Sequence, residues 1–180
     1  MKKIILYCVI VAGVSVTFSS FTGSKLKNQK HFPNHKTMIN KNKEVIRKLY
    51  EEALNRRNYS LLKQLVSEDY IGPRGEKGAE GMEGSVKPLI VSFPEVQWKI
   101  EDLLEEGDKV VVRWYWQATH KETYQGITAT NRLVKSEAIA IYVLKDEKII
   151  GATMITDRLG FLMQLGVILP EQLPGNQSKK

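Results

Sequence analysis

The stretch DKVVVRW, Asp108–Trp114, opens a back half of the chain in which three long strands follow one another. The segments SEAIAIYVL (136–144) and KIIGATMIT (148–156) are the other two, and both are rich in apolar and β-branched residues. Consecutive strands joined by short turns pair as an antiparallel sheet. Asp157 follows the third strand directly. A lone ionisable residue where a strand leaves a sheet is the strongest candidate for chemistry in this sequence.

The composition limits the classes of protein that the chain can belong to. Its 180 residues leave room for one domain plus a leader or tail, and 42% hydrophobic and 26% charged residues are typical of a globular protein. The single cysteine, Cys8, excludes a disulfide framework and a cysteine-based metal site in the body of the chain. His31 and His35 have the spacing of a helical metal pair, but Pro33 lies between them. We therefore expect no metal site.

The positive charge is concentrated near the ends of the chain. The formal net charge is +7, and much of the excess comes from lysines between Lys25 and Lys43 and from Lys179 and Lys180. A nucleic-acid-binding domain would place a basic face, interleaved with aromatic residues, on a folded element. The body of the chain is nearly balanced instead, so we expect no nucleic-acid partner.

The N-terminus has the pattern of a secretory signal peptide. Lys2 and Lys3 precede an apolar run over residues 4–14, and small residues follow. This run is shorter than the roughly 20 residues of a spanning helix. We predict a signal peptide over 1–22 and a secreted or periplasmic protein. The alternative is an uncleaved N-terminal anchor, which would be the protein's only membrane association.

Three further segments follow the predicted leader. Residues 23–39 are rich in Lys, Asn and Ser and predict a flexible spacer. Residues 40–168 form the predicted folded domain, and 169–180 are a C-terminal tail. The domain opens with helices, predicted over 41–56, 59–66 and 80–93, and residues 69–71 between them predict a short strand.

From Val96 onward the apolar period changes from helical spacing to two, which predicts strands. The first covers 96–101, and Gly107 makes the turn into the next. That strand turns Trp114 and Trp116 to the inner face. A short helix follows Asp157 and ends at Gly166. The order predicts an α+β fold: a cone-shaped, curved antiparallel sheet packed against two or three N-terminal helices, with a short closing C-terminal helix.

Several segments together resemble the SnoaL-like polyketide cyclases (ester cyclases) of the nuclear transport factor 2-like superfamily. NKEVIRKLYEE (42–52) and LVSEDY (65–70) are similar to the family's first helices, and GDKVVVRW (107–114) is similar to its central hairpin. Gly126-Ile127 with Thr130, and the stretch from Lys148 to Gly166, extend the resemblance over residues 40–166.

The resemblance implies a conical apolar cavity and ring closure by intramolecular aldol condensation, without metal or cofactor. Asp157 matches the family's general acid/base, a role that suits a carboxyl whose pKa is raised by burial. We predict Asp157 and His120 as catalytic residues on a small apolar carbonyl compound. The predicted ligand-binding wall consists of Tyr50, Tyr70, Trp98, Trp114, Trp116 and Met154.

The chain also departs from the family pattern, which leaves other functions open. Gly151, Ala152 and Thr153 stand where many members carry histidine or aromatic residues. One alternative is a secreted module that binds a small hydrophobic ligand without chemistry. Another is an interaction domain that forms a homodimer through the outer sheet face, which carries Arg113, Tyr115 and Gln117.

The candidate site residues also have plain structural alternatives. Asp157 is placed to cap the closing helix. His120 fits a half-exposed strand end, and Tyr50 fits ordinary packing of the first helix against the core.

Overall fold

The computed structural model describes residues 35–174. The leader predicted over 1–22, most of the predicted spacer and the last six residues of the predicted tail lie outside the described residues. None of the helices within 35–174 has the length and apolar character needed to cross a membrane.

The front half of the domain is largely helical. Helix α1 (His35–Lys48) begins six residues before its predicted start and continues directly into a π-helical turn, η1 (Leu49–Leu54). A 3-10 turn, η2 (Tyr59–Leu61), leads into the short helix α2 (Leu62–Leu65). Helix α3 (Gly78–Ser92) follows strand β1 (Val66–Ile71) and a glycine-rich loop. These positions agree with the predicted helices to within a few residues, apart from the early start of α1.

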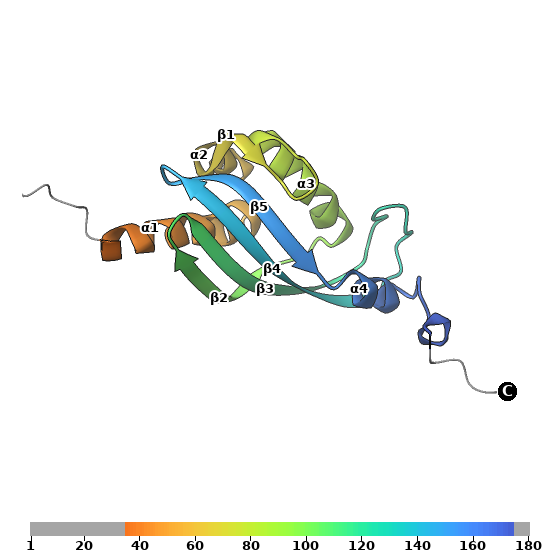
Figure 1. Ribbon diagram of the computed structural model, residues 1–180. Coiled ribbons are helices and arrows are strands. Elements are labelled where there is room, and N and C mark those ends of the chain that lie inside the picture. Colours follow the sequence, from red (N-terminus) through yellow and green to blue (C-terminus); the bar gives the residue numbers. More distant parts are fainter. Residues whose placement is uncertain (1–34, 175–180) are drawn as a thin grey trace, which may run out of the picture. The chain divides into compact units, whose positions relative to one another are not determined.

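The sheet has five strands in the order β1-β5-β4-β3-β2 and is curved and unclosed (Figure 1). The four strands of the back half are β2 (Lys99–Glu106), β3 (Lys109–Thr119), β4 (Leu133–Lys145) and β5 (Lys148–Thr156). They pair antiparallel, as predicted. Strand β1 is longer than the predicted 69–71 and pairs with β5 in parallel. No short turn joins these two strands, so connectivity does not force an antiparallel pairing.

Strand β2 begins later than its alternating pattern predicts. Trp98 falls within the predicted strand. Its backbone N–H and C=O groups, however, form hydrogen bonds with the side chain of Asn55 and not with a neighbouring strand. The Trp98 N–H donates to Asn55 Oδ1 at 2.7 Å, and Asn55 Nδ2 donates to the Trp98 carbonyl at 2.8 Å. This amide clamp holds the end of η1 beside the entrance to β2.

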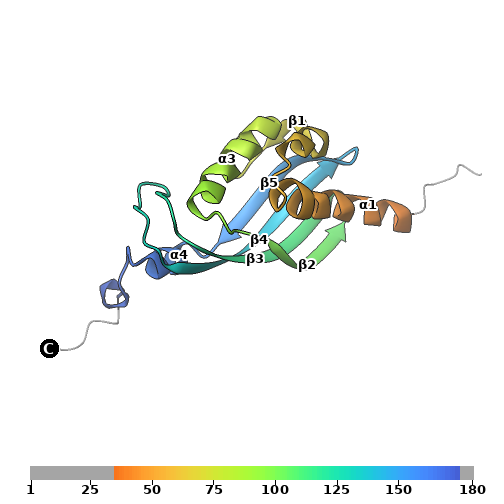
Figure 2. The same cartoon turned by 180° about the vertical axis from the view of Figure 1, so that it is seen from behind.

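The helices α1 and α3 cover one face of the sheet (Figure 2). The inner sides of η1 and β3 form much of the core, with Leu49 and Tyr50 facing Val112, Trp114 and Trp116. The other face of the sheet carries exposed apolar and charged side chains. A short helix, α4 (Arg158–Leu165), closes the domain at one end of β4 and β5. It ends, as predicted, at Gly166, whose φ of 77° is readily accessible to glycine. A last 3-10 turn, η3, covers Pro170–Gln172.

Candidate functional site

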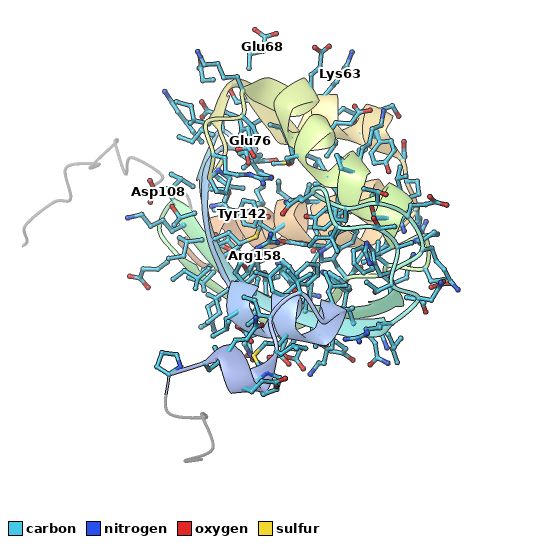
Figure 3. All side chains as sticks on the ribbon, turned by 90° about the vertical axis from the view of Figure 1, so that its right-hand side faces the viewer. Lys63, Glu68, Glu76, Asp108, Tyr142 and Arg158 are labelled. Atoms are coloured by element: carbon cyan, nitrogen blue, oxygen red, sulfur yellow. The ribbon has the colours of Figure 1, made fainter. Side chains whose placement is uncertain are left out.

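A cavity of about 520 Å³ lies between the helices and the inner face of the sheet. Its wall comes from seven elements, η1, β1, α3, β3, β4, β5 and α4, and from the loops between them. Figure 3, viewed from the end at which α4 lies, labels three of the lining residues: Glu76, Tyr142 and Arg158. The lining combines aliphatic and aromatic side chains with a small number of polar groups, as is usual for sites that bind small molecules.

All six residues predicted to bind a ligand line this one cavity. Five of them are buried, and Met154 is half-buried. They meet there because the alternating pattern turns Trp114 and Trp116 inward from β3 and Met154 inward from β5. Their role in binding stays a prediction, although the structure brings them together.

A pair of tyrosines lies in the buried part of the wall. The hydroxyl groups of Tyr50 and Tyr142 are 2.7 Å apart, within hydrogen-bond distance. Burial is the main cause that raises the pKa of Tyr50 well above its ordinary value, and burial raises the pKa of Tyr142 to about 12. Both phenols therefore stay protonated at neutral pH. Tyr50 lies in the π-helical turn, and such turns occur frequently at functional sites.

The indole N–H of Trp114 is the second polar feature of this wall. Its Nε1 atom is buried and finds no hydrogen-bond acceptor within the described part of the chain. The indole lies close enough to the Tyr50 hydroxyl to lower the pKa of that phenol, against the larger effect of burial. It nevertheless does not reach hydrogen-bond geometry. The donor is thus available to a ligand.

Glu76 and Tyr70 approach each other over Gly72. A Cβ atom at Gly72 would lie 2.5 Å from Glu76 Oε2 and 3.0 Å from the Tyr70 hydroxyl. Glu76 accepts hydrogen bonds from Arg74 N at 2.8 Å and Arg74 Nε at 3.1 Å. Burial raises the pKa of the Glu76 carboxyl, but the backbone N–H groups of Glu76 and Arg74 and the Arg74 side chain together lower it. The absent side chain of Gly72 leaves the space that these two polar groups use.

Asp157 lines the cavity, but it is an exposed residue. Its Oδ1 accepts a hydrogen bond from Gly160 N at 2.8 Å, so that Asp157 caps α4 as its structural alternative predicts. Asp157 Oδ2 would lie 2.0 Å from a Cβ atom at position 160, which is therefore open only to glycine while the carboxylate keeps this position. Burial in an apolar pocket, the physical basis of the predicted acid/base role, is absent at Asp157.

His120 lies in the core and does not belong to the cavity wall. It is fully buried, which corrects the prediction of a half-exposed strand end. Its ring stacks on Phe93 with centroids 4.9 Å apart, and its Nδ1 accepts from Thr130 N at 3.2 Å. This bond places the proton of the neutral ring on Nε2, which has no partner among the described residues. The position of His120 does not support the catalytic role predicted for it.

The long connection from β3 to β4 contributes Tyr124 and Gln125 to the cavity. Burial raises the pKa of Tyr124, while the positive charges of Arg74 and Arg158 act in the opposite direction. Both arginines also line the cavity, beside the carboxylates of Glu76 and Asp157. Charged groups of both signs are therefore found on this wall.

Tyr142 and Glu76 are among the lining residues that sequence reasoning missed. Tyr142 follows Ala138 and Ala140 on the inner face of β4, in a row that also contains Ser136. The same alternation that identified Trp114 could have found it. Glu76 lies in an irregular loop, where no periodic pattern predicts the direction of a side chain.

Among the residues that the structure describes, no three His, Cys, Asp or Glu side chains gather as a metal site.

A curved sheet with helices over its inner face and a cavity between them is the architecture of the nuclear transport factor 2-like proteins. The family model for SnoaL-like polyketide cyclase matches residues 44–165. The chain therefore belongs to the SnoaL-like polyketide cyclase family.

Solved structures agree with this assignment. A candidate polyketide cyclase from Acidithiobacillus ferrooxidans is 29% identical with a TM-score of 0.63, and the match covers 72% of this chain and 96% of that one. TsrD from Streptomyces laurentii is 24% identical with a TM-score of 0.66, over 72% of this chain and 97% of that one. AclR, a candidate hydroxylase from Streptomyces galilaeus, is 20% identical with a TM-score of 0.65, over 73% and 99%. The last two show similarity of fold alone. No curated protein sequence matches this chain.

Proposed function

We propose that this protein binds a small, largely apolar carbonyl compound in its cavity and carries out cofactor-independent acid/base chemistry on it, as a cyclase or isomerase. One observation carries the proposal: Asp157, at the position of the family's acid/base, lines the same cavity as the six predicted wall residues. A volume of about 520 Å³ is in the range of sites for small molecules.

In the proposed reaction, the Asp157 carboxylate removes a proton from the carbon next to a carbonyl group, which leaves an enolate. In a cyclisation, that carbon attacks a second carbonyl of the same molecule, a C–C bond forms, and the resulting alkoxide takes the proton back from Asp157. In an isomerisation, the proton returns to a different carbon. Either route conserves electrons and needs no oxidant.

A non-catalytic binding module is the second candidate, and the exposure of Asp157 favours it. A carboxylate that is exposed and caps a helix is fully explained by that structural role. Gly151, Ala152 and Thr153 on β5 supply no ionisable group that could replace it. In this alternative, the aromatic wall binds the same class of ligand without turnover.

Deuterium uptake distinguishes the two candidates. The full chain is incubated with α-tetralone in D₂O, and incorporation at the carbon next to the carbonyl is followed by mass spectrometry. Asp157→Asn is the informative variant, because asparagine caps a helix as well as aspartate does. Asp108→Asn, in the exposed turn between β2 and β3, is the matched control.

A catalytic Asp157 predicts that wild type and Asp108→Asn accelerate deuterium uptake and that Asp157→Asn does so at least about a hundredfold less. Equal rates in all three proteins would reject the acid/base role. Binding of α-tetralone by wild type, without any acceleration of uptake, would instead support the binding module.

We also propose that the protein is exported and acts outside the cytoplasm, on the evidence of the sequence pattern over residues 1–22. N-terminal sequencing of the protein recovered from the producing cells tests this. A mature terminus close to residue 23 supports export with cleavage. Recovery of the intact N-terminus in the membrane fraction supports the anchored alternative, and its recovery in the cytosol contradicts export.

A further inference from the structure

We propose that the buried wall formed by Trp114, Tyr50 and Tyr142 is a hydrogen-bonding site for an uncharged carbonyl oxygen, and that it makes the cavity selective for ketones over hydrocarbons and carboxylates. This inference rests on the proposed function, because it specifies the ligand of the same cavity. It adds the group of the ligand that is recognised and the atoms that recognise it.

Of the three hydrogen-bond donors at this wall, only one is used within the wall itself. The Trp114 indole can only donate, and its N–H has no acceptor within the described residues. The two tyrosines share a single hydrogen bond of 2.7 Å, so one of their two O–H groups donates to the other and one stays free. A buried donor without an acceptor is energetically unfavourable, and an oxygen atom of a ligand would supply that acceptor.

The free donors lie close together, although they come from distant parts of the chain. Tyr50 lies in η1, Trp114 in β3 and Tyr142 in β4, and all three line the cavity. The Tyr50 ring centroid is 6.2 Å from that of Trp114 and 6.3 Å from that of Tyr142. No more than 5% of any of these residues is exposed. A single oxygen with two lone pairs can therefore meet the indole N–H and a phenol O–H together.

The charge at this wall decides which kind of oxygen fits. Four charged residues belong to the described cavity lining. Arg74, Asp157 and Arg158 are exposed, the Glu76 side chain is 17% exposed, and the hydrogen bonds of Glu76 and Asp157 go to groups other than the three donors. The donors themselves are neutral, since burial keeps both phenols protonated at neutral pH. A carboxylate placed here would lose its hydration without gaining a cation. A ketone oxygen has less hydration to lose.

Three probes with one ring skeleton test the inference: α-tetralone, tetralin and the α-carboxylate of tetralin. Binding to the full chain is followed by intrinsic fluorescence, because all three tryptophans of the sequence line the cavity. We expect wild type to bind the ketone about tenfold more tightly than the hydrocarbon. The carboxylate should bind more weakly than the ketone.

Variants assign this preference to the proposed donors. Either single Tyr→Phe substitution would release the remaining phenol O–H as a free donor, so the informative variant is the double substitution Tyr50→Phe/Tyr142→Phe. It removes both hydroxyl groups, keeps both rings and should reduce the preference for the ketone severalfold. Tyr115→Phe, on the opposite face of the sheet, is the matched control and should keep the full preference. Circular dichroism verifies the fold of each variant. A preference that survives unchanged in the double variant overturns the assignment.

A measurement on wild type alone keeps the inference testable if the variants fold poorly. The infrared C=O stretch of bound α-tetralone should shift to lower frequency relative to the ketone in a hydrocarbon solvent, because two donors polarise the carbonyl. An unshifted band, equal affinity for ketone and hydrocarbon, or no binding of the ketone overturns the inference. Ketone preference without deuterium uptake would reject only the proposed catalysis, and uptake without preference would reject only this inference.

Discussion

The hydroxyl oxygens of Tyr50 and Tyr142 lie 2.7 Å apart, although 92 positions separate the two residues in the chain. One comes from the π-helical turn and the other from the inner face of β4. This contact ties the helical layer to the sheet at the wall of the cavity. In the proposed ketone site, stability and ligand recognition therefore depend on the same pair of groups.

A double-mutant cycle on this pair should show that coupling. Tyr50→Phe and Tyr142→Phe should each lower the free energy of unfolding by about 1–3 kcal/mol, because each leaves a buried hydroxyl without its partner. The double variant should lose clearly less than the sum of the two. Urea denaturation gives the free energy of unfolding of wild type, of the two single variants and of the double variant. Strict additivity would show that the two hydroxyl groups do not interact in solution.

Two helical glycines should respond in opposite directions to the same substitution. A Cβ atom at Gly84 in α3 would meet no other atom within 4 Å, so Gly84→Ala should stabilise the protein by about 0.5–1 kcal/mol. A Cβ atom at Gly160 would lie 2.0 Å from Asp157 Oδ2 and would displace the capping carboxylate. The free energy of unfolding of the Gly160→Ala variant should therefore be at least about 1 kcal/mol lower than that of the Gly84→Ala variant. Equal stabilisation by both would contradict the capping geometry.

The buried histidine should make stability depend on pH. Burial lowers the pKa of His120 below its ordinary 6.5, against a smaller opposite effect of the Glu122 backbone. As pH falls through 6.5, the unfolded chain takes up a proton that the folded chain excludes. The free energy of unfolding should therefore be highest above pH 6.5 and decrease from there towards the lowered pKa of the folded state.

His120→Asn tests this origin of the pH dependence, because its side-chain oxygen can still accept from Thr130 N. The variant should show a flatter dependence than wild type when unfolding is measured between about pH 5 and 7. If the free energy of unfolding of His120→Asn changes with pH as steeply as that of wild type, groups other than His120 cause the pH dependence.

We also propose that the outer sheet face forms a homodimer interface. Ile139 of β4 pairs in register with Ile155 of β5 and is flanked on its other side by Arg113 of β3. The two isoleucines are 48% and 73% exposed, and exposed apolar side chains on a sheet favour association. Ile139→Lys should shift sedimentation towards monomer, whereas Leu159→Lys, an exposed apolar position on α4, should not. A wild-type protein that stays monomeric at high concentration would contradict the proposal.

Local patterns in the sequence determined most of the secondary structure. The alternation from Val110 to Trp116 predicted the buried face of β3, and the turn at Gly107 was predicted from the residues around it. The capping of α4 by Asp157 and its end at Gly166 also follow from neighbouring residues. Each of these features depends on contacts within a few positions, so the sequence alone is sufficient to predict them.

Only the tertiary structure decided how the site is assembled. The parallel pairing of β1 with β5, the meeting of Tyr50 with Tyr142 and the burial of His120 all depend on residues that are distant in the chain. The exposure of Asp157 is likewise set by what packs around it. Periodicity predicts which face of an element is apolar, but it does not predict which distant group faces it across the core. The chain pattern thus predicted the wall of the cavity, and packing decided where its donors and its carboxylates lie.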